Sequence, residues 1–196
     1  MNNLLNIVKK NNYIQKYKRN INKDYNSLSF LISKECCLSQ SDCIKVGIAI
    51  EKVLTDIILS YSTGFVDIKS KNIKNKQERD HLFINRDNKI LIYSELKSNL
   101  NLDTEKSKST VSKCLKIVKE LQKEFPGYHI KWCLLGLRYN TRTGINNKIL
   151  YKYYEIEKNV YGLNEYLEMF NIDLLFSENE YSEFLNMIVK AMLKQI

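Results

Sequence analysis

The sequence has little proline and glycine, with one proline and six glycines among its 196 residues. It contains no glycine-rich phosphate-binding loop, no internal repeat and no low-complexity segment. Of its two histidines, His129 is placed to begin a strand, and no pairing of a histidine with a serine or cysteine nucleophile is indicated. These absences argue against phosphate-loop enzymes, repeat proteins, and serine or cysteine hydrolases.

The five cysteines are odd in number and include no Cys-x-x-Cys pair. Their spacing therefore predicts neither a disulfide framework nor a zinc site. No apolar run approaches the roughly 20 residues of a membrane-spanning helix, and the first ten residues lack the continuous apolar segment of a secretion signal. We therefore expect a cytoplasmic protein that has no membrane partner.

The composition and length fit an ordinary globular domain, since 44% of the residues are hydrophobic. The formal net charge is +9 and the isoelectric point is about 9.2, a balance that favours a polyanionic partner such as nucleic acid or an anionic membrane. The abundance of Asn, Lys, Ile and Tyr also fits an A/T-rich coding genome, which would raise the lysine content without any such partner. Charge alone thus leaves the partner open.

Two apolar runs around residues 79–99 are joined by a polar turn, Arg86-Asp87-Asn88. This pattern predicts a β-hairpin. Asp80 immediately precedes the first run. Glu95 and Lys97 are two residues apart in the second run, so their side chains should project from the same face of a strand.

Two carboxylates on adjacent strands, Asp80 and Glu95, would form an oxygen-lined pocket that suits Mg²⁺, with Mn²⁺ as a substitute. Lys97 would complete the group, because an ammonium beside a metal-bound water can orient the water and stabilise charge on a phosphate. The residues therefore predict a metal-dependent catalytic site in which Asp80 and Glu95 bind the metal and Lys97 positions the nucleophile.

Asp80 followed by Glu95-Leu96-Lys97 resembles the signature of the PD-(D/E)xK nucleases, with Arg79 in place of the proline that usually precedes the aspartate. Residues 93–109 resemble the catalytic segment of type II restriction endonucleases of this superfamily. The resemblance implies a restriction-endonuclease-like α/β core that cuts double-stranded DNA at a specific short site. It also implies that the backbone carbonyl of Leu96 binds the metal.

A helix is predicted over residues 43–61, where apolar residues recur every three or four positions. In many PD-(D/E)xK nucleases a helix before the hairpin supplies a glutamate to the metal site, which makes Glu51 a fourth catalytic candidate. The alternative is a helix-surface glutamate that pairs with Lys52 or Thr55.

Downstream, a helix over 103–125 is predicted to bury Val111, Leu115, Val118 and Leu121. A near-continuous apolar strand over 128–139 follows, which predicts a crossover and parallel pairing with the Glu95 strand. A further strand is predicted over 151–156, and the chain is expected to be helical from residue 163 onward. The predicted fold class is α/β, a mixed central sheet flanked by helices.

Candidate DNA contacts lie in two places. Lys106, Lys108 and Lys113 occupy the early turns of the helix over 103–125. The loop after the apolar strand contains side chains that read bases or hold phosphates, namely Arg138, Asn140, Arg142, Asn146 and Asn147. Solvated helix and loop surfaces are the alternative for both sets.

We therefore expect a single nuclease domain over 1–196, with a basic N-terminal arm over 1–23, a basic loop over 69–76 and a helical C-terminal part over 163–196. Cutting both strands of a palindromic site would require a homodimer. Two alternatives remain: a junction resolvase or DNA-repair nuclease with the same core, and a non-catalytic DNA-binding module in which the hairpin is only structural.

Overall fold

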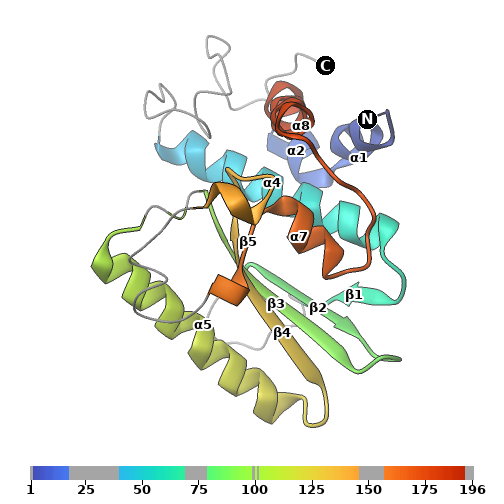
Figure 1. Ribbon diagram of the computed structural model, residues 1–196. Coiled ribbons are helices and arrows are strands. Elements are labelled where there is room, and N and C mark those ends of the chain that lie inside the picture. The colour runs from blue at the N-terminus through green and yellow to red at the C-terminus, as the bar shows by residue number, and fades with distance from the viewer. Residues whose placement is uncertain are drawn as a thin grey trace. The chain divides into compact units, whose positions relative to one another are not determined.

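The computed structural model describes residues 2–17, 40–68, 79–98, 100, 102–145 and 157–192. Contacts between residues divide the chain into two compact units (Figure 1). One unit combines residues 1–61 with 175–196 and is called the helical unit here, and the other spans 62–174 and is called the sheet unit. The assignment of both to one nuclease domain stays a prediction.

The helical unit contains α1 (Asn2–Lys10), α2 (Asn12–Tyr17), α4 (Gln40–Tyr61) and α8 (Glu178–Met192). These four helices contact one another around a shared apolar core. The predicted helix over 43–61 is confirmed, with an earlier start at Gln40. Buried residues of these helices include Leu4, Val8, Ile14, Val46, Ile50, Val53, Leu54, Ile57, Ile58, Phe184, Leu185 and Ile188.

Asn11 connects α1, α2 and α4. Its side-chain oxygen accepts a hydrogen bond from the Ile14 backbone N–H at 3.1 Å, which satisfies a donor in the first turn of α2. Its amide nitrogen donates to Asp56 of α4 at 2.7 Å. The first part of the predicted basic arm thus forms two helices that belong to a core, and residues 18–23 lie outside the described residues.

The sheet unit is built on five strands in the order β1 (Phe65–Asp67), β2 (His81–Asn85), β3 (Ile90–Lys97), β4 (His129–Gly136) and β5 (Val160–Tyr161). The β1–β2 and β2–β3 pairs are antiparallel, whereas β4 pairs parallel to both β3 and β5. The predicted hairpin, the parallel crossover and the α/β class with a mixed sheet are confirmed.

One strand prediction differs from the structure at its end, and one is not tested by it. The strand predicted over 128–139 ends earlier, at Gly136, because Leu137 to Tyr139 begin a turn in which the Tyr139 N–H bonds to the Gly136 carbonyl. The strand predicted over 151–156 lies outside the described residues. On the side of β4 away from β3, the structure places β5.

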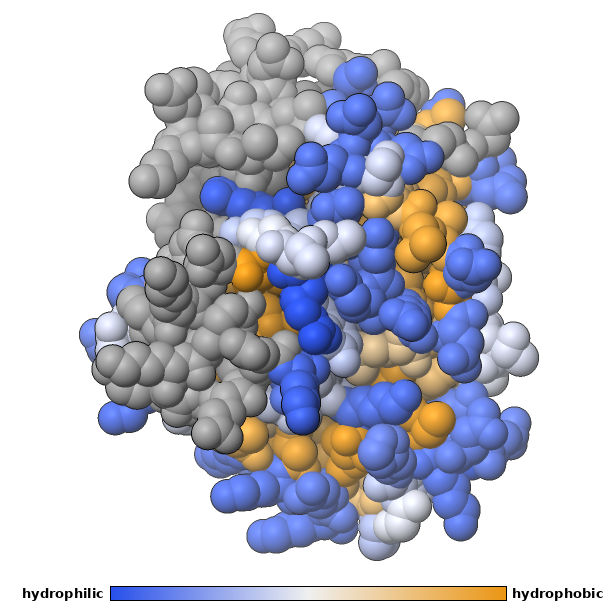
Figure 2. Space-filling view, viewed as in Figure 1, coloured by the Kyte–Doolittle hydropathy of each residue, from blue (hydrophilic) through white to orange (hydrophobic). Residues whose placement is uncertain are grey.

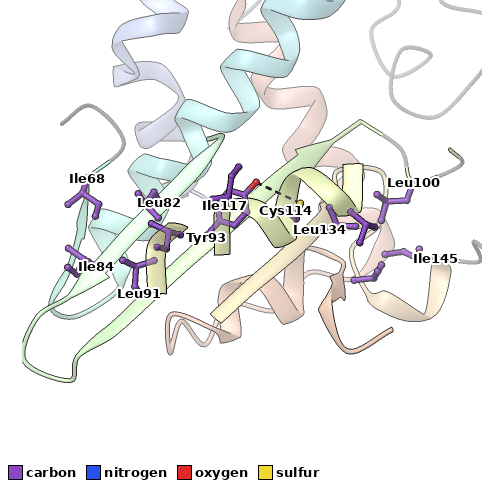
Figure 3. Packing of buried hydrophobic residues seen from close by; sticks show 13 residues of the cluster. Ile68, Leu82, Ile84, Leu91, Tyr93, Leu100, Cys114, Ile117, Leu134 and Ile145 are labelled. Atoms are coloured by element: carbon purple, nitrogen blue, oxygen red, sulfur yellow. Dashed lines mark hydrogen bonds between the residues drawn. The ribbon is translucent and has the colours of Figure 1, made fainter. Parts of the chain in front are cut away.

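Helix α5 (Thr104–Glu124) makes the crossover and covers one face of the sheet. Its N-cap is Asp103, whose carboxylate accepts a hydrogen bond from the Lys106 N–H at 2.8 Å. Figure 3 shows the side chains of this core, including Cys114 and Ile117 of α5 against Leu82, Tyr93 and Leu134 of the strands. The prediction that Leu115 is buried was wrong: the buried stripe runs through Cys114, and Leu115 is 41% exposed.

An aromatic cluster covers the opposite face, where α7 (Leu163–Glu168) packs. Phe170 makes edge contacts with Phe65, Phe83 and Tyr166 at centroid distances of 5.1, 5.1 and 5.3 Å. His81 Nδ1 lies 2.6 Å from the Tyr166 hydroxyl. These contacts hold β2 at its first residue, directly beside Asp80.

Hydrophilic side chains cover much of the coloured face in Figure 2. Within the described part of the chain, no helix is long and apolar enough to cross a membrane.

Candidate active site

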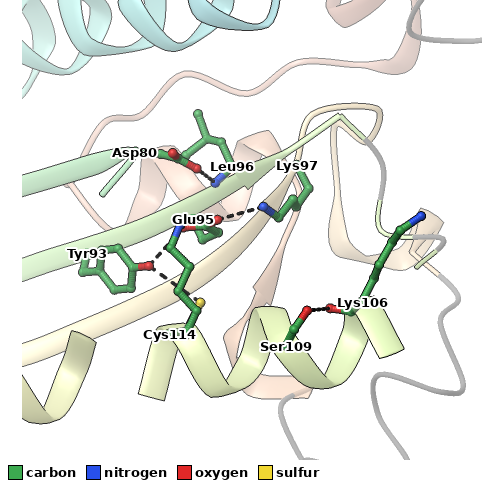
Figure 4. Close-up of polar contacts among 9 residues, drawn as sticks. Asp80, Tyr93, Glu95, Leu96, Lys97, Lys106, Ser109 and Cys114 are labelled. Carbon is green, nitrogen blue, oxygen red and sulfur yellow. Dashed lines mark hydrogen bonds and ion pairs between the residues drawn. The ribbon is translucent and has the colours of Figure 1, made fainter. Parts of the chain in front are cut away.

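The strand register brings the predicted hairpin residues together. His81 pairs with Ser94 in the antiparallel β2–β3 ladder, so continuing that register by one residue places Asp80 opposite Glu95. Asp80 also accepts a hydrogen bond from the Leu96 N–H at 2.7 Å. Lys97 lies on the same face of β3 as Glu95, and this is the face that α5 covers (Figure 4).

The Glu95 carboxylate is buried and bound by three donors. Lys97 Nζ lies 2.8 Å from Oε1, and Lys113 Nζ lies 2.8 Å from both Oε1 and Oε2. The Tyr93 hydroxyl donates to Oε2 at 3.1 Å. The Glu95 side chain is only 2% exposed, and a buried carboxylate is stable as an anion only when it is paired in this way.

The same contacts determine the protonation state of the site. Burial alone would raise the Glu95 pKa, but hydrogen bonds from Lys113 and Lys97 outweigh it and hold the pKa below its ordinary value of 4.5. Burial would likewise lower the Lys113 pKa, but the Glu95 hydrogen bond and the Glu95 and Asp80 charges raise it above 10.5. Both groups are therefore charged across neutral pH.

These two shifts predict a pH window for the stability supplied by the Lys113–Glu95 pair. The lowered Glu95 pKa means that this contribution is lost as pH falls through the folded-state value, below 4.5. The raised Lys113 pKa means that it is lost as pH rises through that residue's folded-state value, above 10.5. The free energy of unfolding in urea should differ most between the wild type and Lys113→Met at pH values between these two limits. An equal difference at all pH values would contradict the pairing.

Lys113 is the residue of this site that sequence reasoning missed, because it was grouped with Lys106 and Lys108 as a DNA contact. It lies between Thr110 and Ile117, which both belong to the buried stripe of α5. No signal in the sequence marked this contact, because the apolar pattern of the helix did not show that its buried stripe runs through Cys114 and not through Leu115.

Tyr93 and Cys114 complete the buried side of the site. Burial raises the pKa of Tyr93 far above its ordinary value and raises the pKa of the Cys114 thiol to about 12. Both therefore stay protonated at neutral pH. The Tyr93 hydroxyl lies 3.1 Å from Glu95 (Figure 4) and 3.8 Å from Cys114 Sγ (Figures 3 and 4). Tyr93 is thus a permanent donor that fixes the orientation of the Glu95 carboxylate.

The donor set can be compared with what metals require. Among the described residues, no group of three or more His, Cys, Asp or Glu side chains could hold a metal ion. The candidate site therefore does not suit zinc, because zinc takes three or four His, Cys, Asp or Glu ligands. Mg²⁺ needs only one or two carboxylates and completes its shell with water and substrate phosphates. Asp80 and Glu95, together with the Leu96 carbonyl, fit that requirement.

Glu51 lies on α4 of the helical unit, whereas the other candidates lie in the sheet unit. Its side chain is 14% exposed, and its Oε1 lies 4.0 Å from Lys52 Nζ. The Thr55 hydroxyl donates to its backbone carbonyl at 3.0 Å. A role for Glu51 at the metal site stays a prediction.

Arg79, which replaces the proline of the nuclease signature, is a buried side chain of the sheet unit. Its Nη2 lies 3.9 Å from Glu120 and 3.7 Å from Glu124, both on α5. Within the described residues, none of its three guanidinium nitrogens has a hydrogen-bond partner. Arg79 thus links the start of the hairpin to α5 through charge, one residue before Asp80.

The candidate DNA contacts differ in accessibility. Lys106 is 73% exposed and lies 3.4 Å from Asp103, and Lys108 is also exposed. Arg138 and Asn140 are half-buried. The Arg142 guanidinium lies over the Tyr161 ring, 4.8 Å from its centroid.

The backbone of this second set is held by the start of α7. The Arg142 N–H donates to Glu165 Oε1 at 2.8 Å, and the Asn140 carbonyl accepts from the Asn164 N–H at 2.8 Å. The remaining candidates, Asn146 and Asn147, and the basic loop over 69–76 lie outside the described residues.

The arrangement combines carboxylates with ammonium groups. Asp80 lies opposite Glu95 in the register of the hairpin, and the Lys97 and Lys113 side chains, which are 31% and 27% exposed, both bond to Glu95. Comparisons of the chain with protein-family models, curated proteins and solved structures found no match.

Proposed function

We propose that the chain is a Mg²⁺-dependent endonuclease that hydrolyses phosphodiester bonds of double-stranded DNA at a specific short site, as type II restriction enzymes do. One observation carries the proposal: Glu95 and Lys97 bond to each other on one face at the end of β3, Asp80 bonds to the Leu96 N–H between them, and Glu95 is ionised. Asp80, Glu95 and the Leu96 carbonyl would hold the metal. When bound, the metal would acidify a water and neutralise developing charge on the phosphate.

The residues of the chain have separate tasks in this proposal. Lys97 is two residues from Glu95 on the same strand face, and its side chain is 31% exposed. It can therefore orient a water or a phosphate oxygen while it stays paired with Glu95. Tyr93 donates to the other carboxylate oxygen and prevents rotation of the group.

Contacts outside the reacting centre would come from Lys106 and Lys108 to phosphates, and from Arg138, Asn140 and Arg142 to phosphates or bases. Cleavage of both strands of a palindromic site would use two copies of the site, which makes a homodimer part of the proposal.

Digestion of mixed-sequence linear DNA with Mg²⁺, followed by sequencing of the ends, tests the proposed function. A discrete set of ends is expected, and Mn²⁺ should substitute for Mg²⁺. Random ends would contradict site specificity. If linear duplex stays intact while a four-way junction is cut, the same core acts as a junction resolvase. If neither DNA is cut, the proposed endonuclease activity is wrong.

One observation favours a second candidate, a DNA-binding module without catalysis. Both Glu95 oxygens are already bound by Lys97, Lys113 and Tyr93, as in a structural ion-pair network. A titration with Mn²⁺ in the presence of DNA separates the two. The nuclease requires Mn²⁺ binding that Asp80→Asn abolishes, whereas the module requires none.

A further inference from the structure

Access to Glu95 is controlled by the two lysines. The carboxylate is 2% exposed, whereas the side chains of Lys97 and Lys113 are 31% and 27% exposed. The lysines are therefore the accessible part of the site, and the carboxylate lies behind them. Any cation that binds Glu95 has to replace at least one ammonium contact.

Lys113 holds the position that such a cation would take. Its Nζ lies 2.8 Å from both carboxylate oxygens of Glu95, whereas Lys97 Nζ bonds to Oε1. Lys97 is on the same strand as Glu95, but Lys113 comes from α5, 18 residues further along the chain. Withdrawal of Lys113 would leave Glu95 with its Lys97 and Tyr93 contacts and expose an oxygen pair.

The charges of the site favour this exchange only when a phosphate is present. Asp80 and Glu95 contribute two negative charges, and Lys97 and Lys113 contribute two positive charges, so the group is neutral as it stands. A neutral group attracts a divalent cation weakly. A DNA phosphate adds negative charge and offers the Lys113 ammonium a second acceptor, which lowers the cost of releasing Glu95.

We propose that Lys113 is a substrate-responsive latch on Glu95: it occupies the carboxylate in the free protein and moves to a DNA phosphate on binding, so that DNA and the divalent metal bind cooperatively. This inference rests on the proposed nuclease function. Lys113 acts through Glu95 and is therefore a positioning residue. Because linkage is reciprocal, the metal tightens DNA binding by the same factor.

The Mn²⁺ affinity of the full chain tests the latch. It is measured from the electron paramagnetic resonance signal of free Mn²⁺, once without DNA and once with a saturating short duplex. A titration of the duplex alone corrects for Mn²⁺ on DNA. In the wild type, DNA should tighten Mn²⁺ binding about tenfold or more, within the roughly 5- to 150-fold range of allosteric coupling. Lys113→Met should bind Mn²⁺ without DNA as tightly as the wild type does with it.

Lys116→Met is the matched control, because it removes one lysine from the exposed side of the same helix. It should retain the wild-type coupling. If DNA changes the wild-type Mn²⁺ affinity less than about twofold, the latch is wrong, and this result does not depend on whether Lys113→Met folds. Mn²⁺ binding without coupling would overturn the latch alone. No Mn²⁺ binding under any condition would overturn the nuclease function and the latch together.

Discussion

Replacing Lys97 with alanine is expected to reduce DNA cleavage by about 100- to 1,000-fold, the usual effect of removing one positioned donor from a phosphate or oxyanion site. DNA binding should be retained, because Lys106 and Lys108 stay in place. The protein should also fold, since Glu95 keeps its bonds to Lys113 and Tyr93. Single-turnover cleavage and a binding titration in the presence of Ca²⁺ measure the two properties separately.

Lys119→Ala is the control for this substitution, because it removes an exposed lysine of α5 that has no place in the proposed site. It should cleave like the wild type. Equal cleavage by Lys97→Ala and the wild type would show that Lys97 does not position the nucleophile, even if the protein is a nuclease. Loss of cleavage accompanied by loss of binding would also contradict the role assigned to it.

Replacing Gly162 with alanine is expected to destabilise the sheet unit by about 1–3 kcal/mol, the usual cost of overpacking. A Cβ at this position would lie 2.5 Å from the Thr141 carbonyl carbon and 2.6 Å from its Cα and N. The obstacle is neighbouring backbone, which cannot rotate away as a side chain can. The φ angle of Gly162 is −85°, so the backbone conformation itself would suit alanine. Urea unfolding of the full chain measures the effect.

The same substitution should weaken DNA binding, because Gly162 packs against the segment that carries Arg138, Asn140 and Arg142. Glu165 joins the two segments, since its carboxylate accepts from the Gly162 N–H at 3.2 Å and from the Arg142 N–H at 2.8 Å. A Cβ would push them apart. If the stability falls while DNA affinity is unchanged, this loop does not contribute to the DNA surface.

Gly47→Ala on α4 is the matched glycine control. A Cβ there meets no atom within 4 Å, and replacing a mid-helix glycine with alanine stabilises by about 0.5–1 kcal/mol. The two glycine substitutions should therefore change the free energy of unfolding in opposite directions. Destabilisation by both would show that the Gly162 effect is not specific to the Thr141 contact.

Local patterns predicted the hairpin correctly because their information lies within a few residues. The Arg86-Asp87-Asn88 turn lies between β2 and β3, and the two-residue period of a strand places Glu95 and Lys97 on one face. The parallel pairing of β4 with β3 followed from the length of the crossover helix. The same reasoning failed for Leu115, because neighbouring apolar residues on a helix do not show which of them faces the sheet.

The sequence by itself determined the hairpin, its two acidic residues and the lysine that follows them, because each of these depends on strand alternation and one short turn. Only the tertiary structure decided that Lys113 binds both oxygens of Glu95 and that Arg79 lies near Glu120 and Glu124. Those contacts depend on the rotation of α5 about its axis as it packs on the sheet. That rotation is set by the fit of Val111, Cys114 and Ile117 into the whole core, which no local stretch of sequence encodes.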